Sequence, residues 1–186
     1  MNARQKSLEK IWEITVFAML GAIMFISKIV MEFLPNIHLL GVLIATYTLV
    51  YRVKALIPIY VYVFLNGVYA GFGTWWIPYL YIWAILWGAI MLIPKRTPKK
   101  ILIPVCVVLC TLHGLAFGVL YAPFQALVFG FSWKQTLAWI VAGFSFDVIH
   151  AVGNLIVGFL IYPLSRVLNK MELGYRQKIG IVKSTK

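Results

Sequence analysis

The chain has 186 residues, of which 62% are hydrophobic and only 12% are charged, and its mean hydropathy is +0.91. Soluble domains are about 45–50% apolar and about 25% charged, so this composition excludes a soluble globular protein and indicates one integral membrane domain with about six spans. Seventeen Lys and Arg against five acidic residues give a net charge of +12. The placement of that charge along the chain indicates membrane topology and argues against nucleic-acid binding.

Six apolar segments, expected to form an all-α transmembrane bundle, are separated by short breaks. The first follows a basic N-terminus but ends in "SKIVMEFLPN" without a signal-peptide cleavage pattern, so we interpret it as a retained span. The second is short for a hydrocarbon core of about 30 Å. Ser132 and Gln135 match a capping box that begins the last helix, and Pro163 lies near its expected end. The expected spans are residues 11–34, 37–51, 55–72, 77–94, 101–122 and 135–163.

Lysine and arginine residues concentrate on one side of the expected bundle. The N-terminal tail holds three, the break at residues 51–55 two, the break at 94–100 four and the C-terminal tail six, which is 15 of the 17. Cytoplasmic loops carry such an excess, so we expect both termini in the cytoplasm of a bacterial cell, with some contact to anionic lipid. The six in the C-terminal tail are Arg166, Lys170, Arg176, Lys178, Lys183 and Lys186.

Polar and aromatic side chains gather in the half of the bundle opposite these basic loops. Lys28 and Glu32 are four residues apart at the outer end of the first span and can pair, and Asn36 and His38 follow them. Ionisable groups within a span are costly unless they face a cavity or a partner, so each is a candidate site residue. The other candidates are Asn66, Tyr79, Trp83, Trp87, His113, Tyr121, Gln125, Asp147, His150 and Asn154.

Two interpretations remain open for the last helix, where Asp147, His150 and Asn154 share one face. They can form a satisfied network between helices, or they can face a binding site. Polar groups from five helices coincide at one end of the bundle, however. That coincidence predicts an outward-opening pocket with aromatic walls and a few hydrogen-bonding groups.

The stretch "AGFGTWWIPYLYIWAILW" at residues 70–87 holds four of the seven tryptophans, namely Trp75, Trp76, Trp83 and Trp87. An aromatic belt at the membrane boundary accounts for Trp75 and Trp76 about as well as a ligand does. Trp83 and Trp87 lie too deep for a belt, so we expect them to line the pocket.

The stretches "AMLGA" in the first helix and "FDVIHAVGNLIVGFLIYPL" in the last, within residues 10–165, resemble the S component of energy-coupling factor (ECF) vitamin transporters. The first helix carries "AMLGA", in which Ala18 and Ala22 match the small-xxx-small motif of that family. The last helix reads "FDVIHAVGNLIVGFLIYPL", and "LPNIHLLGVLIATYTLVYR" together with "WWIPYLYIW" is similar to Firmicute S components. The number of spans and the expected orientation of the termini agree with this resemblance.

The resemblance implies a high-affinity binder of a vitamin or related micronutrient. It implies a transmembrane coupling protein and two cytoplasmic ATPase subunits as partners, with Ala18 and Ala22 on the coupling face. The chain has neither a Walker A nor a GxGxxG pattern, so the partners would hydrolyse ATP and the chain itself would be no enzyme and hold no cofactor.

The resemblance also gives the tryptophans a role. "GFGT" would be a flexible loop that closes over the pocket with Trp75 and Trp76 as its lid, and Trp83 and Trp87 would stack on a flat heteroaromatic substrate. Thiamine or its pyrimidine precursor, a pyridoxine-like compound and a queuosine precursor remain open as substrates, whereas riboflavin would need a larger cavity.

Two other classes of function are weighed against this one. An intramembrane enzyme could use Asp147 and His150 as an acid–base pair, but the chain has no GxSG-type nucleophile, no HExxH and no paired acidic metal motif. A self-sufficient carrier would need a homo-oligomer, because six spans without a repeat are few for alternating access. Cys106 and Cys110 share a helix face and are interpreted as packing residues, with no metal site expected.

Overall fold

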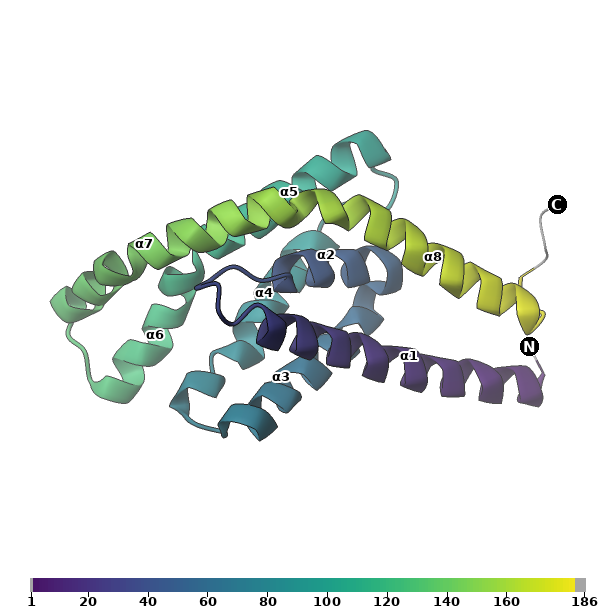
Figure 1. Cartoon of the computed structure of the whole chain (residues 1–186), viewed down its shortest axis with the longest axis horizontal. Coiled ribbons are helices and arrows are strands. Elements are labelled where there is room, and N and C mark those ends of the chain that lie inside the picture. Colours follow the sequence, from purple (N-terminus) through teal and green to yellow (C-terminus); the bar gives the residue numbers. More distant parts are fainter. Residues whose placement is uncertain (1, 183–186) are drawn as a thin grey trace.

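The computed structural model describes residues 2–182, and these residues form helices and connecting turns without a strand (Figure 1). Lys183 and Lys186, which were counted for topology, lie outside the described residues. Three short 3₁₀ turns, η1 (Arg52–Ala55), η2 (Thr74–Trp76) and η3 (Gly158–Leu160), join neighbouring helices. The α-helices are α1 (Ala3–Val30), α2 (Leu40–Tyr51), α3 (Leu56–Ala70), α4 (Tyr79–Met91), α5 (Lys99–Leu115), α6 (Phe117–Phe129), α7 (Trp133–Val157) and α8 (Ile161–Lys178).

Five helical runs among the described residues are long and apolar enough to cross a membrane. An all-helical protein with several such runs is what the composition predicted. The run that joins α2 to α3 is bent, because Arg52 has a φ of 54° and ends α2 (Figure 1). The five runs are Ala3–Val30, Leu40–Ala70, Thr74–Met91, Lys99–Phe129 and Trp133–Lys178.

The short helix α2 is the centre of the bundle. Its residues 40–48 are all buried, and it packs against α4, α5, α7 and α8. A helix that is apolar on every side belongs in a protein core or in a membrane span, and the burial of α2 by its neighbours explains why it lacks the amphipathic pattern of a surface helix. Being enclosed by other helices, α2 does not have to match the bilayer thickness by itself.

Helices α1 and α3 approach closely at Gly21. A Cβ atom at this position would overlap Val61 of α3 and would lie 3.0 Å from the carbonyl oxygen of Pro58. Small residues permit such close backbone contact between membrane helices. Ala18 is exposed and Ala22 is half-buried, so the small residue that α1 uses for its packing inside the bundle is Gly21.

Two helices extend beyond their expected ends. The break expected at residues 122–133 is partly helical, because α6 continues to Phe129. The next residue, Gly130, adopts the left-handed conformation (φ 66°) that commonly ends a helix. The last helix bends at η3 and continues as α8 to Lys178 instead of ending near Pro163. Pro163 is the third residue of α8, and a proline in the first turn removes no helical hydrogen bond. The capping box of Ser132 and Gln135 at the start of α7 is confirmed.

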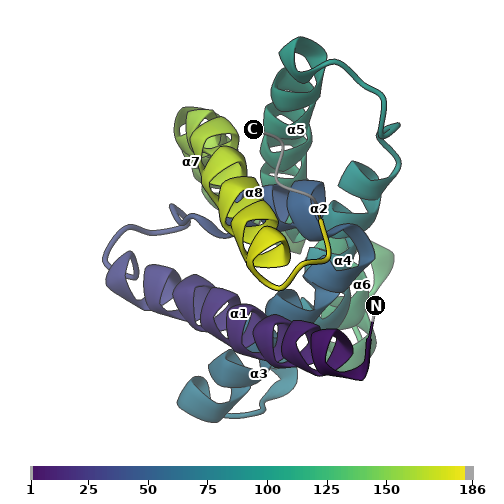
Figure 2. The same cartoon turned by 90° about the vertical axis from the view of Figure 1, so that its right-hand side faces the viewer.

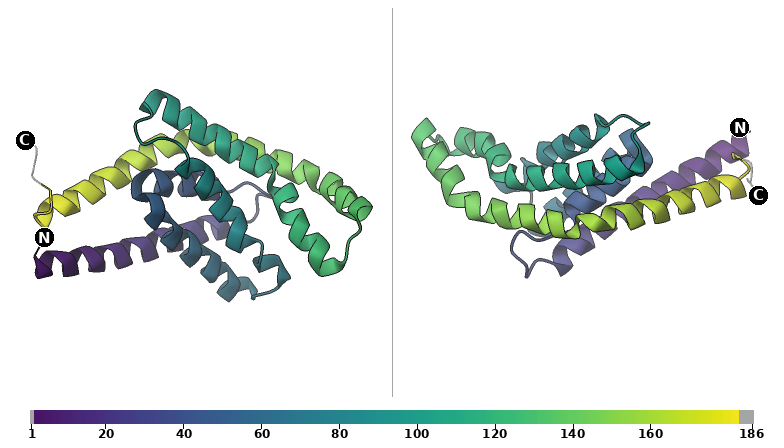
Figure 3. Two further views of the ribbon diagram at one scale, coloured as in Figure 1. Left: turned by 180° about the vertical axis from the view of Figure 1, so that it is seen from behind. Right: turned by 90° about the horizontal axis from the view of Figure 1, so that it is seen from above.

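The N-terminal part of α1 and the C-terminal part of α8 extend together from the bundle, and Figures 1–3 show their ends near each other at the same end of the molecule. Trp12 stacks on Tyr175 with ring centroids 4.0 Å apart, and its Nε1 donates to Glu172 at 3.1 Å. Arg176 pairs with Glu9 at 3.2 Å and with Glu172 at 2.7 Å. These contacts hold the two helix ends together.

Candidate functional site

A cavity of about 290 Å³ lies where α1, α3, α4, α6 and α7 meet the segment between α1 and α2. Tyr62, Tyr79, Trp83 and Phe117 form aromatic walls, and His150 of α7 lines the same space. Residues 34–38 also line it, and because Pro35 and Asn36 among them are exposed, this segment lies between the cavity and the outside; we call it the covering segment. Larger hollows of about 460 and 1010 Å³ border α8, but no histidine lines them. The smaller cavity is lined by two histidines and Trp83, each with a ring nitrogen left unpaired within residues 2–182.

Trp83 is the central ring of the cavity wall. It is 1% exposed, and its ring centroid lies 5.7 Å from Tyr79, 5.6 Å from Phe117 and 6.2 Å from Tyr62. The contacts with the two tyrosines are edge-to-face, the geometry that aromatic quadrupoles favour. The expectation that Trp83 lines a pocket agrees with this position.

Three ring nitrogens around the cavity have no hydrogen-bond partner among the described residues. They are Nε1 of Trp83, Nε2 of His150 and Nδ1 of His38. A buried polar group left unpaired costs about 1–3 kcal/mol, so native structures nearly always satisfy such groups. A ligand or an ordered water with complementary groups would satisfy these three atoms.

Two of the three histidines of the chain, His38 and His150, line the cavity, and the third, His113, does not. The rings of His38 and His150 are 4.6 Å apart, and His113 lies behind Trp83 at 5.7 Å. His113 Nε2 is 3.0 Å from the carbonyl oxygen of Ile82; because a carbonyl only accepts, this nitrogen carries the hydrogen. Burial lowers the pKa of His38 to about 4, so His38 is neutral at pH 7. Residues 2–182 contain no group of three His, Cys, Asp or Glu that could hold a metal ion.

Charged groups are confined to the rim of the cavity. Lys28 Nζ and Glu32 Oε1 are 3.0 Å apart, as their spacing predicted, and both residues line the cavity with side chains that are 25% and 53% exposed. The covering segment follows directly, and it turns at Asn36, which has a φ of 57°. The interior therefore offers neutral nitrogens and aromatic faces, and the charges lie where a ligand would enter.

Asp147, predicted to face the site, instead holds the beginning of α6. Both of its carboxyl oxygens lie 3.1 Å from the backbone nitrogen of Gly118, the second residue of that helix. This contact satisfies a backbone N–H that has no partner within the helix. A Cβ at Gly118 would collide with the carboxyl group, so the glycine is what permits the contact.

Asn154 also connects helices and does not line the cavity. Its Nδ2 donates to the carbonyl oxygen of Cys110 at 2.9 Å, and Cys110 in turn donates to Gly41 at 3.3 Å. Cys110 and Cys106 are buried free thiols at this junction of α2, α5 and α7, in agreement with their interpretation as packing residues. Of the three polar residues on one face of α7, the structure brings only His150 to the cavity.

Trp75 and Trp76 do not line the cavity, although they lie beside its aromatic wall. Trp76 Nε1 donates to the carbonyl oxygen of Val63 at 2.7 Å. Trp75 packs on Tyr79, and its carbonyl oxygen accepts from Tyr121 at 3.0 Å. These bonds attach η2 to α3 and α6. The segment that covers the cavity is residues 34–38.

Trp87, Asn66 and Gln125 are also outside the cavity lining. Trp87 Nε1 donates to the carbonyl oxygen of Arg52 at 3.1 Å, at the opposite end of α4. Asn66 is buried, and its Nδ2 lies 3.4 Å from the carbonyl oxygen of Tyr62. Gln125 is half-buried on α6. Helical periodicity assigns each of these residues to one face of its helix. It does not say which neighbouring helix that face contacts.

Sequence reasoning did not select Tyr62, Phe117 or the covering residues 34–38. The polar residues of "LPNIH" after the first span were a usable signal for the cover, because Asn36 and His38 stand out at the end of an apolar segment. Tyr62 and Phe117 gave no such signal, since aromatic residues are frequent throughout this chain.

Comparison of the chain with protein-family models, with curated proteins and with solved structures gave no match. The described residues therefore define only a class: an all-helical protein with five apolar runs able to cross a membrane and a partly open, aromatic-walled cavity beside residues 34–38.

Proposed function

We propose that this protein is the substrate-binding S component of an ECF-type importer and binds a small heteroaromatic micronutrient in the cavity beneath residues 34–38. The observation that carries the proposal is the set of unpaired nitrogens of Trp83, His150 and His38 around an aromatic-walled space. Burying unpaired polar groups is costly, and a ligand that bonds to them removes that cost. The sequence resemblance supports the same function.

The cavity constrains the chemistry of the substrate. Its volume of about 290 Å³ is at the lower end of ligand pockets, about 300–1,000 Å³, and suits one ring or a small pair of rings. Trp83 Nε1 can only donate, whereas a neutral histidine has one donor and one acceptor nitrogen. A planar ring with both acceptor and donor groups, such as a substituted pyrimidine or pyridine, matches this lining. Lys28 and Glu32 would meet polar substituents at the rim.

We further propose six crossings, with both chain ends in the cytoplasm. The run Leu40–Ala70 has 31 residues, as many as the run Lys99–Phe129, so its length does not by itself separate one crossing from two. Its bend at Arg52 supports two crossings, α2 and α3. The ends of α1 and α8 lie near each other at one end of the molecule (Figure 1), and the two tails of the sequence carry nine of its 17 Lys and Arg residues.

The partners in this proposal are a transmembrane coupling protein and two cytoplasmic ATPase subunits. Ala18 is exposed and Ala22 half-buried on α1, whereas Gly21 between them faces α3. The two alanines thus leave a shallow surface on the side of α1 that faces away from α3, where another helix can approach. Co-purification of ATPase subunits would separate this function from a self-sufficient carrier or an enzyme.

The test begins with mass spectrometry of small molecules released from natively purified protein, and with binding measurements for that ligand, thiamine, its pyrimidine precursor and pyridoxine. Trp83→Phe keeps an aromatic ring but removes the N–H donor. We expect affinity to fall about threefold to tenfold, the value of one neutral hydrogen bond. The control is Trp133→Phe, which changes an exposed tryptophan outside the cavity and should leave affinity unchanged. Equal effects of the two substitutions, or no binding of any of these compounds, would contradict the proposal.

A further inference from the structure

An open groove of about 1010 Å³ lies between the beginning of α5 and one face of α8, away from the aromatic cavity. Lys99, Arg166 and Lys170 line it together with the apolar side chains of Val167 and Leu173. All five are exposed. None of the three basic residues forms an ion pair within the part of the chain that the structure describes.

The groove lies where two helices leave their apolar segments. After Lys100, α5 and α6 contain no Asp, Glu, Lys or Arg. On the α7–α8 run, residues 148–165 contain none either, and Arg166 is the first charged residue after them. Because the lipid-facing part of a membrane helix is nearly free of charge, these positions mark the boundary between hydrocarbon and headgroups.

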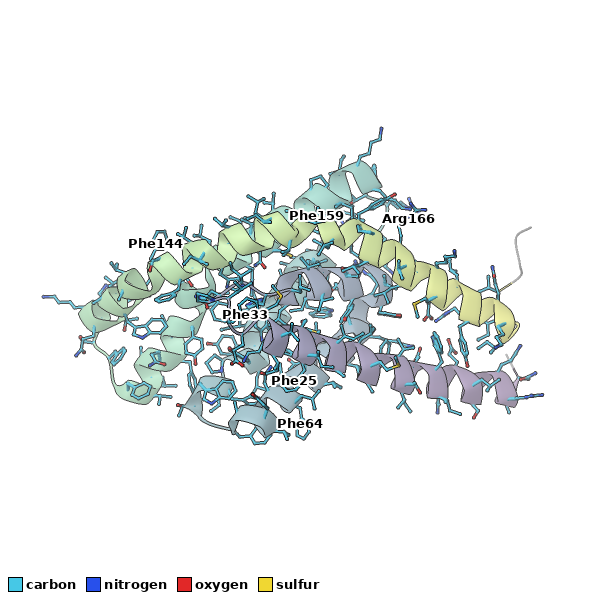
Figure 4. The ribbon with its side chains drawn as sticks, in the orientation of Figure 1. Phe25, Phe33, Phe64, Phe144, Phe159 and Arg166 are labelled. Atoms are coloured by element: carbon cyan, nitrogen blue, oxygen red, sulfur yellow. The ribbon has the colours of Figure 1, made fainter. Side chains whose placement is uncertain are left out.

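One face of α8 passes from aromatic to basic at this boundary. Tyr162, Arg166 and Lys170 follow at i, i+4 and i+8, so they share a face, and the Arg166 guanidinium lies 5.7 Å from the Tyr162 ring. Phe159, 68% exposed, precedes them on the same run, and Figure 4 shows Phe159 and Arg166 following one another along it. Tyrosine beside arginine and lysine is typical of the headgroup region.

The positive charge of the groove is not balanced by nearby acids. No acidic residue lines it. The one acid of α8, Glu172, bonds to Arg176 and Trp12 toward α1. We propose that this groove binds the headgroup of an anionic phospholipid, with the phosphate held by Arg166, Lys99 and Lys170 and the apolar side chains contacting the beginning of the acyl chains. A guanidinium binds two phosphate oxygens at once, whereas each lysine acts as a point charge.

Phosphatidylglycerol titrated into the protein in a neutral detergent, followed by native mass spectrometry, tests this site. The groove variant is Lys99→Gln, Arg166→Gln and Lys170→Gln combined. The matched control, Arg4→Gln, Lys6→Gln and Lys10→Gln, removes the same charge from exposed positions on α1. Each basic residue near anionic lipid contributes about fivefold in affinity, so the groove variant should bind on the order of 100-fold more weakly. Phosphatidylcholine should bind the wild type and both variants equally weakly.

Two outcomes would overturn the proposal. Equal loss of phosphatidylglycerol binding in both variants would mean that binding depends on overall charge and not on the groove. Unchanged binding in the groove variant would mean that the lipid binds elsewhere. Arg166→Gln alone, expected to weaken binding about fivefold or more, keeps the test decisive if the triple variant does not fold. None of these outcomes depends on the substrate or on the partners of the protein.

Discussion

Replacing Asp147 tests whether its carboxyl group stabilises the fold or contacts a ligand. In the structure its two oxygens share a single donor, the backbone N–H of Gly118. Removing the carboxyl group therefore loses one capping interaction and not two. Gly118 is buried, so in Asp147→Ala its N–H would be left without a partner. An unpaired buried group costs about 1–3 kcal/mol, and loss of a helix cap about 0.5–2 kcal/mol. We expect Asp147→Ala to lower the free energy of unfolding by about 1–3 kcal/mol.

Asp147→Asn is the matched control, because its amide oxygen can still accept from Gly118. We expect a loss of less than about 1 kcal/mol, the lower end of the capping range, and unchanged ligand affinity in both variants. The measurements are unfolding in mixed micelles and titration with the ligand identified from the purified protein. If Asp147→Asn weakened binding tenfold or more while the free energy of unfolding stayed the same, Asp147 would belong to the binding site and the capping argument would be wrong.

Two further predictions concern coupling and orientation. Ala18→Trp should leave substrate affinity unchanged in the purified protein. It should reduce uptake to background in cells that also express the coupling protein and ATPases, because the ring would occupy the exposed surface of α1. Loss of affinity, or normal uptake, would count against a coupling face. A cysteine at Arg96 should resist a membrane-impermeant thiol reagent in intact cells, whereas a cysteine at Thr74 should react. Both positions are exposed, so labelling at position 96 would reverse the proposed orientation.

Part of the candidate site was predictable because its signals are local. Trp83 and His150 were selected because such residues are rare at depth in apolar segments, and both line the cavity. The pairing of Lys28 with Glu32 and the capping box at Ser132 follow from helical periodicity, and the structure contains both. Each of these inferences needs only the chemistry of one helix.

The rest depended on which helix faces meet. Asp147, His150 and Asn154 share a face of α7, yet they contact the start of α6, the cavity and the α5 backbone respectively. A helix of 25 residues passes several neighbours along its length, so one face does not mean one environment. Trp87 likewise lies on the same helix as Trp83 but bonds to Arg52 at the far end.

The amino-acid sequence by itself determined that this is a helical membrane protein, because backbone groups in hydrocarbon must be satisfied within each helix and a long apolar run has no other stable form. It also determined which segments lack charged residues, since that depends only on the order of residues along the chain. Tertiary structure alone decided that α2 is the buried centre, that residues 34–38 cover the cavity and that Asp147 caps α6. These features arise from side-chain packing between segments far apart in the chain, and hydrophobicity, which has no direction, does not specify which segments those are.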